Sequence, residues 1–183
     1  MLNLGALLFL LLSSLPLDAQ DSSALEYRTK ASFLSKFPSF IAWPEDALPP
    51  GQAPFLLCVF GDFSFGTSLA EITRGTTAHA RRVEVRWVRK EQELASCQIL
   101  FVSRSEQKRY IQVLEAVRGQ SVLTVGETAE FLNAGGIVSF SMEEERLRFD
   151  INLEEANRVH LRFSSRLLAL ARRVVNKAEA AKS

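Results

Sequence analysis

Residues 61–66 (GDFSFG) place Ser64 between two glycines directly after an apolar run, the position of a nucleophile elbow or a phosphate loop. The spacing does not fit GxSxG, and the loop has neither GxGxxG nor a Walker lysine. Ser64 fits better as the N-cap of a following helix, with the glycines making the turn. A hydrolase that acts through Ser64 would also need a histidine and an acid within reach of the hydroxyl.

Two histidines and two carboxylates are the other candidates for catalysis or metal binding. His79 lies in a polar segment and His160 in the last expected helix, with no carboxylate at ligand spacing. Asp150 and Glu154 flank an expected strand-to-helix turn, where carboxylates favour the helix N-terminus. We therefore expect no catalytic residues, no cofactor and no metal site, and a protein that is not an enzyme.

Three arginines form the remaining charged pattern. Arg158, Arg162 and Arg166 are spaced at i, i+4 and i+8, so on one continuous helix they share a face. Such a row is suited to contact an anionic ligand or an acidic partner surface. The alternative is a solvated face whose arginines pair with nearby glutamates such as Glu154.

The two cysteines are Cys58, inside an expected strand, and Cys97, just before another. If these strands are neighbours, as in a doubly wound sheet, the two sulfurs can form a disulfide. The alternative is two buried free thiols that pack as small hydrophobes. Neither cysteine has a nearby histidine or a CxxC arrangement, which argues against a catalytic thiol.

The N-terminus predicts export, and export favours the disulfide. Residues 2–17 are apolar and uncharged, too short for a stable span but suited to a signal peptide. We place the signal peptide at residues 1–19, with cleavage after Ala19 or near Ser23, and a buried N-terminal helix is the alternative. No second long apolar run follows, so we expect no stable membrane insertion after cleavage.

The remaining residues, 20–183, are expected to form a single domain. The charge is nearly balanced, with 22 basic and 21 acidic residues, which argues against nucleic acid as a partner.

Periodicity predicts a three-layer α/β domain with a mainly parallel sheet of roughly six strands, helices on both faces and a C-terminal antiparallel hairpin. Helices are expected near residues 23–43, with Pro38 ending the first early, and near 64–73, 105–117, 127–133 and 154–175. In the first helix, Leu25, Ala31 and Leu34 recur at helical spacing, and Phe40 and Trp43 are expected in the core. The expected strands are residues 55–60, 82–88, 98–102, 121–125, 137–142 and 146–153.

Several ordered segments resemble the YfiR family of exported bacterial proteins. They span nearly the whole expected mature chain, and they are residues 30–34 (KASFL), Phe37, 40–44 (FIAWP), 58–61 (CVFG), 97–101 (CQILF), 123–125 (LTV), Phe131, 135–137 (GGI), 149–152 (FDIN), Ala156, Leu161 and 164–171 (SSRLLALA).

This resemblance implies a periplasmic repressor that binds the periplasmic sensor domain of an inner-membrane diguanylate cyclase and lowers cyclic-di-GMP signalling and biofilm formation. It also implies a homodimer and a disulfide between Cys58 and Cys97 that is redox-sensitive. A second family cysteine pair has no counterpart in this chain. The alternative function is a periplasmic small-ligand sensor or adaptor for another envelope signalling system. Its pocket would lie at the carboxyl ends of the strands, lined by residues 61–65 or by the three arginines.

Overall fold

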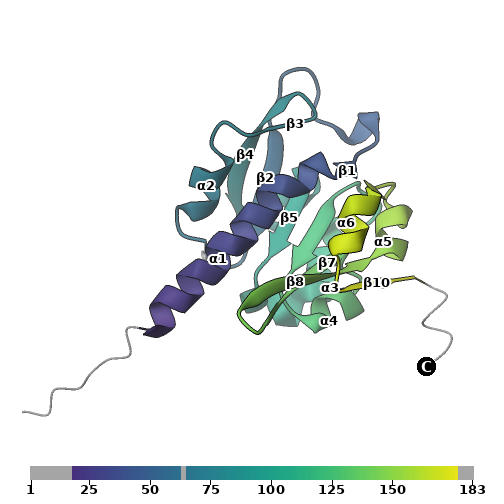
Figure 1. Ribbon diagram of the computed structural model, residues 1–183. Helices are drawn as coiled ribbons and strands as arrows, with labels where there is room; N and C mark the ends of the chain where they lie inside the picture. The colour runs from purple at the N-terminus through teal and green to yellow at the C-terminus, as the bar shows by residue number, and fades with distance from the viewer. Residues whose placement is uncertain (1–17, 63–64, 177–183) are drawn as a thin grey trace, which may run out of the picture.

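The computed structural model describes residues 18–62 and 65–176, so Ser64 and residues 1–17 of the expected signal segment (1–19) lie outside the described residues. Ten strands and six α-helices alternate along this part of the chain (Figure 1). The helices are α1 (Asp18–Lys36), α2 (Ser68–Thr73), α3 (Tyr110–Ala116), α4 (Ala129–Asn133), α5 (Leu153–Arg158) and α6 (Ser165–Leu170). The strands are β1 (Ile41–Ala42), β2 (Phe55–Phe60), β3 (Thr77–Ala78), β4 (Arg81–Val88), β5 (Ile99–Val102), β6 (Leu123–Gly126), β7 (Val138–Glu143), β8 (Arg146–Asn152), β9 (Arg162–Phe163) and β10 (Arg173–Val175). Short 3-10 helices cover Phe37–Ser39, Glu45–Ala47, Glu91–Ser96 and Arg104–Arg109.

Eight strands form the main sheet, in the order β10-β8-β7-β6-β5-β2-β4-β3. From β4 to β7 the neighbours are parallel, and β7 and β8 form the expected antiparallel hairpin. The fold class is therefore confirmed. The two strands beyond the expected six are the short edge strands β3 and β10, which pair over only two and three residues.

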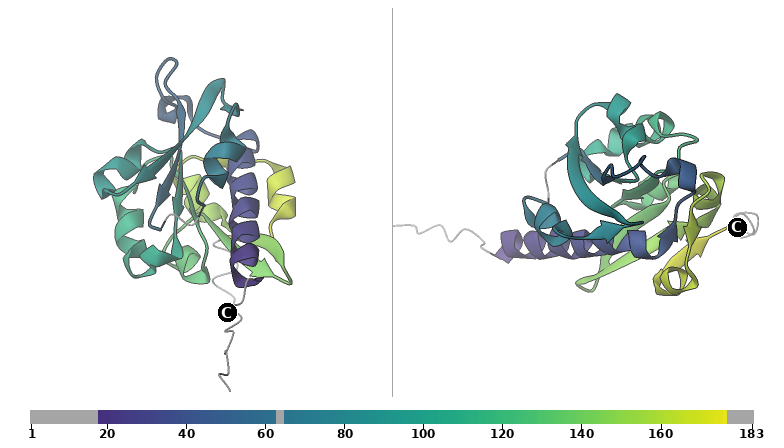
Figure 2. Two further views of the ribbon diagram at one scale, coloured as in Figure 1. Left: turned by 90° about the vertical axis from the view of Figure 1, so that its left-hand side faces the viewer. Right: turned by 90° about the horizontal axis from the view of Figure 1, so that it is seen from above.

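Both faces of the sheet are covered, as the sequences of the central strands require (Figure 2). All six residues of β2 and all four of β5 are buried, because parallel strands with helices on both sides have no solvated face. One core cluster lies beneath α1, α2 and α6, and a second lies beneath α3 and α4. Trp43 is in the first cluster and only 6% exposed, whereas Phe40 packs against that cluster half-buried.

The first helix ends as expected but buries a different face. α1 stops at Lys36, and Pro38 lies in the following 3-10 turn. Leu25, expected on the packed face, is 67% exposed, whereas Tyr27 and Lys30 are buried. The buried face of α1 therefore includes a lysine and excludes Leu25.

The expected single helix over residues 154–175 is wrong. α5 ends at Arg158, and His160 adopts φ 60° while the Leu161 N–H donates to the Ala156 carbonyl over 2.9 Å. This 6→1 bond with a left-handed residue is a Schellman-type helix end, which reverses the chain into β9. A new helix, α6, then begins at Ser165, and its N-cap Ser164 accepts the Leu167 N–H with its hydroxyl.

Candidate functional site

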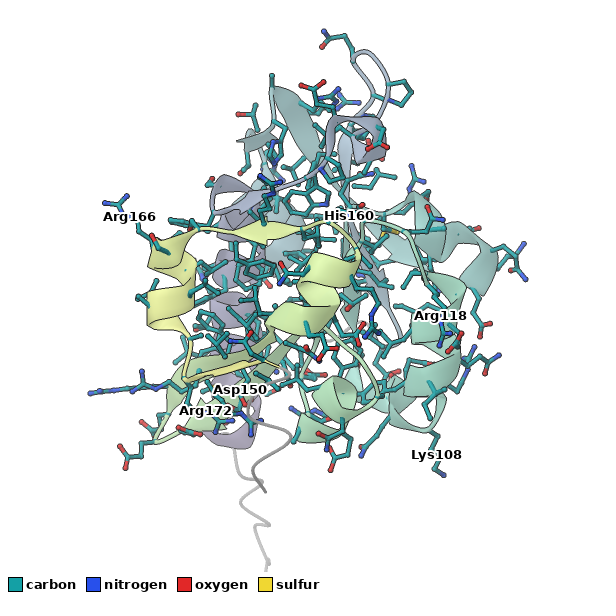
Figure 3. The ribbon with its side chains drawn as sticks, turned by 90° about the vertical axis from the view of Figure 1, so that its right-hand side faces the viewer. Lys108, Arg118, Asp150, His160, Arg166 and Arg172 are labelled. Carbon is teal, nitrogen blue, oxygen red and sulfur yellow. A yellow bond between two sulfur atoms is a disulfide. The ribbon has the colours of Figure 1, made fainter. Side chains whose placement is uncertain are left out.

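The break in the last helix separates the three arginines that were expected on one face. Arg158 ends α5, Arg162 lies in β9, and Arg166 points outward from α6 (Figure 3). All three side chains are exposed, and Arg158 forms ion pairs with Glu154 and Glu155 at 3.3 and 2.7 Å. The expectation that the three arginines share one helical face is therefore wrong. Arg158 instead fits the alternative, a solvated arginine paired with nearby glutamates.

Three cavities open at the amino-terminal edge of the sheet, and Arg158, Arg162 and Cys97 are among the residues that line them. The largest, of about 620 Å³, is lined by Trp43, His160 and Arg162. A second, of about 440 Å³, is lined by Cys97, Gln98 and residues of the 46–54 loop. A third, of about 230 Å³, includes Arg158, and it shares Gln120 and Val122 with the second.

The charges around these cavities are mixed. The arginines that line them are Arg86, Arg118, Arg158 and Arg162, and the carboxylates are Glu45, Asp46, Glu115 and Glu155. Trp43 lines the 620 Å³ cavity, and its indole Nε1–H donates over 3.0 Å to the carbonyl of Ser121, which lines the 440 Å³ cavity. The amino edge therefore has several cavities lined by charges of both signs, which suits a protein partner of mixed polarity or a small ligand.

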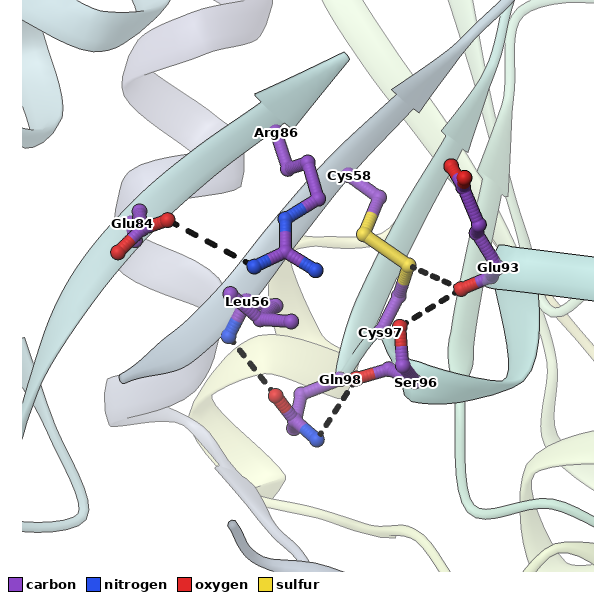
Figure 4. The surroundings of a disulfide bond; sticks show 8 residues. All are labelled: Leu56, Cys58, Glu84, Arg86, Glu93, Ser96, Cys97 and Gln98. Atoms are coloured by element: carbon purple, nitrogen blue, oxygen red, sulfur yellow. Dashed lines mark hydrogen bonds and ion pairs between the residues drawn. A yellow bond between two sulfur atoms is a disulfide. The ribbon is translucent and has the colours of Figure 1, made fainter. Parts of the chain in front are cut away.

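The disulfide is confirmed. Cys58 in β2 and Cys97 just before β5 are bridged, with their Cα atoms 5.9 Å apart (Figure 4). The expected reason also holds, because β2 and β5 are adjacent in the sheet. Arg86 lies opposite Cys58 on β4, so the bond has a guanidinium-bearing residue as its cross-strand neighbour. Both cysteines are almost fully buried.

The carboxyl-terminal edge, where doubly wound sheets bind ligands, is occupied by the chain itself. The strand order reverses between β2 and β5, and the loops after these strands touch. Gly61 has φ 101°, and a Cβ there would lie 2.7 Å from Ser105 Oγ, so only glycine fits. The Asp62 N–H donates to the same hydroxyl over 3.0 Å.

Side chains of α1 cover this edge beside those loops. Lys30 Nζ lies 2.5 Å from Glu127 Oε2, and Glu127 directly follows β6. Tyr27 donates its hydroxyl to Glu127 over 3.0 Å and stacks edge-to-face on Phe65, with ring centroids 5.2 Å apart. Of the residues 61–65 expected to line a sensor pocket, 63 and 64 lie outside the described residues, whereas Asp62 contacts Ser105 and Phe65 packs against Tyr27 of α1.

Glu127 is held as a carboxylate although its side chain is fully buried. Burial by itself would raise the pKa of Glu127. The charge and hydrogen bond of Lys30, together with the Arg104 N–H at 2.8 Å, outweigh burial and lower that pKa. The Glu127 carboxylate, which follows β6, thus contacts both Lys30 of α1 and the Arg104 N–H after β5.

The described residues that were considered for catalysis, His79, Asp150 and Glu154, each have other surroundings. Ser64 is outside the described residues, His79 stacks on Phe55 and Trp43, and Asp150 is bound by the guanidinium of Arg172. Asp150 therefore does not serve the α5 N-terminus as expected, whereas Glu154 does lie in its first turn. Among residues 18–62 and 65–176, no group of three or more metal-ligating side chains occurs.

Sequence reasoning missed the Lys30–Glu127 pair. The available signal was a lysine at a core position, since Tyr27, Lys30 and Leu34 follow helical spacing. Nothing local indicates its partner, which lies 97 residues away.

Two solved structures show the same fold. The ABC domain in complex with L-Trp from Streptococcus pneumonia has 12% sequence identity and a TM-score of 0.53. A conserved domain protein from Vibrio cholerae has 10% identity and a TM-score of 0.53. Each match covers 81% of this chain and 60% of the other, so this chain spans about 60% of their length. At such identities the likeness concerns the fold alone.

The family described as YfiR/HmsC-like matches residues 27–172. The match includes both cysteines, the Lys30–Glu127 pair and the three arginines, and it covers well over half of the 183 residues. The resemblance seen in the ordered motifs is confirmed, and the chain belongs to the YfiR/HmsC-like family.

Proposed function

We propose that this protein is an exported regulator that binds the periplasmic domain of an inner-membrane diguanylate cyclase. By this contact it lowers cyclic-di-GMP synthesis and biofilm formation. Residues 1–19 serve as its signal peptide, residues 20–183 form one domain, and the working form is a homodimer.

The observation that carries this proposal is the family match over residues 27–172, because YfiR/HmsC-like membership supports a periplasmic regulator of cyclic-di-GMP signalling at the level of the family. The buried disulfide fits an oxidising compartment. In the described part of the chain, no helix is long and apolar enough to cross a membrane.

The amino edge is the surface we assign to the partner. Large exposed hydrophobic side chains among the described residues lie on four different elements. They are Leu25, Ile111, Met142 and Leu170. The amino edge instead combines cavities with exposed charges, as in interfaces with a polar rim.

The cavities also favour a second function, a sensor for a small ligand. The 620 Å³ cavity beside Trp43 and Arg162 falls within the range of ligand pockets. Both functions are compatible, since a ligand that binds one state better shifts the population of the repressing form.

Direct binding tests the proposal. Purified residues 20–183 are titrated by calorimetry with the purified periplasmic domain of a membrane diguanylate cyclase from the same genome. We expect saturable binding that Arg162→Glu weakens about tenfold, or roughly 1.4 kcal/mol. Arg146→Glu is the matched control, because Arg146 is exposed and pairs with Glu143 at the carboxyl end of β7, at the opposite edge of the sheet. If no such domain binds, a diguanylate cyclase is not the partner. If both variants lose affinity equally, the amino edge is not the binding surface.

A further inference from the structure

The cluster at the carboxyl-terminal edge has the composition of a receptor for an ammonium ion. Two carboxylates, Glu26 and Glu127, each place an oxygen 2.5 Å from Lys30 Nζ. The Tyr27 ring covers the same nitrogen, with 4.3 Å between the nitrogen and the ring centroid. Carboxylate acceptors and an aromatic face are the groups that recognise ammonium cations in proteins.

Glu127 and Tyr27 of this receptor are buried and held by contacts that do not involve Lys30, whereas the Glu26 side chain is 22% exposed. The side chain of Glu127 is fully buried and accepts hydrogen bonds from the Tyr27 hydroxyl and the Arg104 N–H. Tyr27 is fixed in turn by its edge-to-face contact with Phe65. Removing only the end of the lysine side chain would therefore leave most of the acceptor geometry in place.

The two carboxylates of the cluster need a second cation besides Arg104 for charge balance. Arg104 lies 3.5 Å from Glu26 and 3.6 Å from Glu127, and its side chain is 58% exposed. Lys30 is 1% exposed and is the cation that lies between the two carboxylates. Without it, a buried carboxylate would lack its main counter-ion, which is strongly unfavourable.

We propose that Glu26, Tyr27 and Glu127 form a binding site for a primary ammonium group, which the chain fills with its own Lys30. Lys30 thus acts as a ligand that is covalently part of the chain. α1 places its ammonium group at the carboxyl-terminal edge, where doubly wound sheets bind ligands. A ligand that opens this edge must replace the ammonium of Lys30. The site does not depend on the identity of the signalling partner.

Chemical rescue tests this site directly. Lys30→Ala removes three methylenes and the ammonium, and n-propylammonium supplies both. We expect the variant to be destabilised and its Tm to rise saturably, by at least about 2 °C, when n-propylammonium is added. Wild type should show no such rise, because the tethered Lys30 holds the site at a higher effective concentration than the added amine. If Lys30→Ala is isolated unfolded, recovery of a cooperative melting transition on adding the amine is the expected result.

Two compounds separate an ammonium site from a cavity. Propan-1-ol matches the amine in size without its charge, and tetramethylammonium has the charge without N–H donors. We expect neither to rescue Lys30→Ala. Adding Glu127→Gln to the variant should weaken the n-propylammonium response at least about tenfold, since one charged acceptor is lost.

Arg28→Ala is the matched control, because Arg28 lies on the exposed face of α1. It should melt like wild type and ignore the amine. No response of Lys30→Ala to n-propylammonium would overturn the proposal, as would an equal response to propan-1-ol or an equal response in wild type.

Discussion

Lys30 Nζ lies 2.5 Å from Glu127 Oε2 with both side chains buried, and this contact joins α1 to the end of β6. The helix begins at this carboxyl edge and packs Ala31 and Leu34 on the sheet (Figure 1), and the 3-10 turn and β1 that follow it lead to Trp43 at the amino edge. The segment from Lys30 to Trp43 thus contacts both edges, where ligands or partners would act.

Lys30→Met tests the contribution of this ion pair to stability. Methionine retains the apolar stem but leaves Glu127 as a buried carboxylate without its main partner, so we expect a loss of about 3–5 kcal/mol of unfolding free energy. The double variant Lys30→Met and Glu127→Gln should recover part of this loss, because it no longer buries an unpaired charge. Urea unfolding gives both values. A single variant as stable as wild type would contradict the account, and Arg28→Met provides the baseline for a change on the exposed face of α1.

Acid stability should report on Glu127. The pKa of Glu127 is lowered from its ordinary value of 4.5, so the folded state binds a proton less readily than the unfolded chain. Its contribution is therefore fully present above pH 4.5 and is lost as the pH falls through the lower folded value. We expect Glu127→Gln to flatten the dependence of unfolding free energy on pH in this acid range, although it is less stable at neutral pH. Parallel wild-type and variant curves would show that Glu127 does not titrate this way.

The Cys58–Cys97 bond should stabilise the fold substantially. It closes a loop with a sequence separation of 39, which corresponds to about 4 kcal/mol in the chain-entropy account. We expect dithiothreitol under unfolding conditions to lower the Tm of wild type. The double variant Cys58→Ala and Cys97→Ala should melt near the reduced protein and be insensitive to dithiothreitol. If mass mapping of protein from the periplasm finds two free thiols, the bond does not operate there.

Trp43 is expected to be the main aromatic anchor of the amino edge. It is 6% exposed, packs on Phe55 with ring centroids 5.1 Å apart and donates to the Ser121 carbonyl. Trp43→Ala should cost about 3–5 kcal/mol of unfolding free energy. Phe40→Ala should cost less, because Phe40 is only half-buried. Guanidinium unfolding of both variants checks this order, and a reversed order would contradict the packing described.

Local patterns predicted the parts of the fold that depend on short stretches of chain. The buried runs of β2 and β5, the alternation of β4 and the β7–β8 hairpin follow from hydrophobicity and turn chemistry. The disulfide followed from cysteine placement and the adjacency of two strands.

The errors arose where helix-capping signals were missed or where tertiary contacts decide the structure. Helical spacing continues through residues 154–175, yet the Schellman-type end at His160 and the cap at Ser164 divide that segment. Leu25 fits the apolar stripe of α1, but its side chain is exposed to solvent, five residues before the buried Lys30. No periodicity links Lys30 to Glu127, because long-range ion pairs leave no local pattern.

The most direct test of the central claim is the cellular level of cyclic-di-GMP in a strain that lacks this gene. It is compared with the same strain complemented by the intact gene and by a copy lacking residues 1–19. The account predicts a rise in cyclic-di-GMP that the intact gene reverses and the leaderless copy does not. An unchanged level in the deletion strain, or full reversal by the leaderless copy, would contradict a repressor that acts in the periplasm.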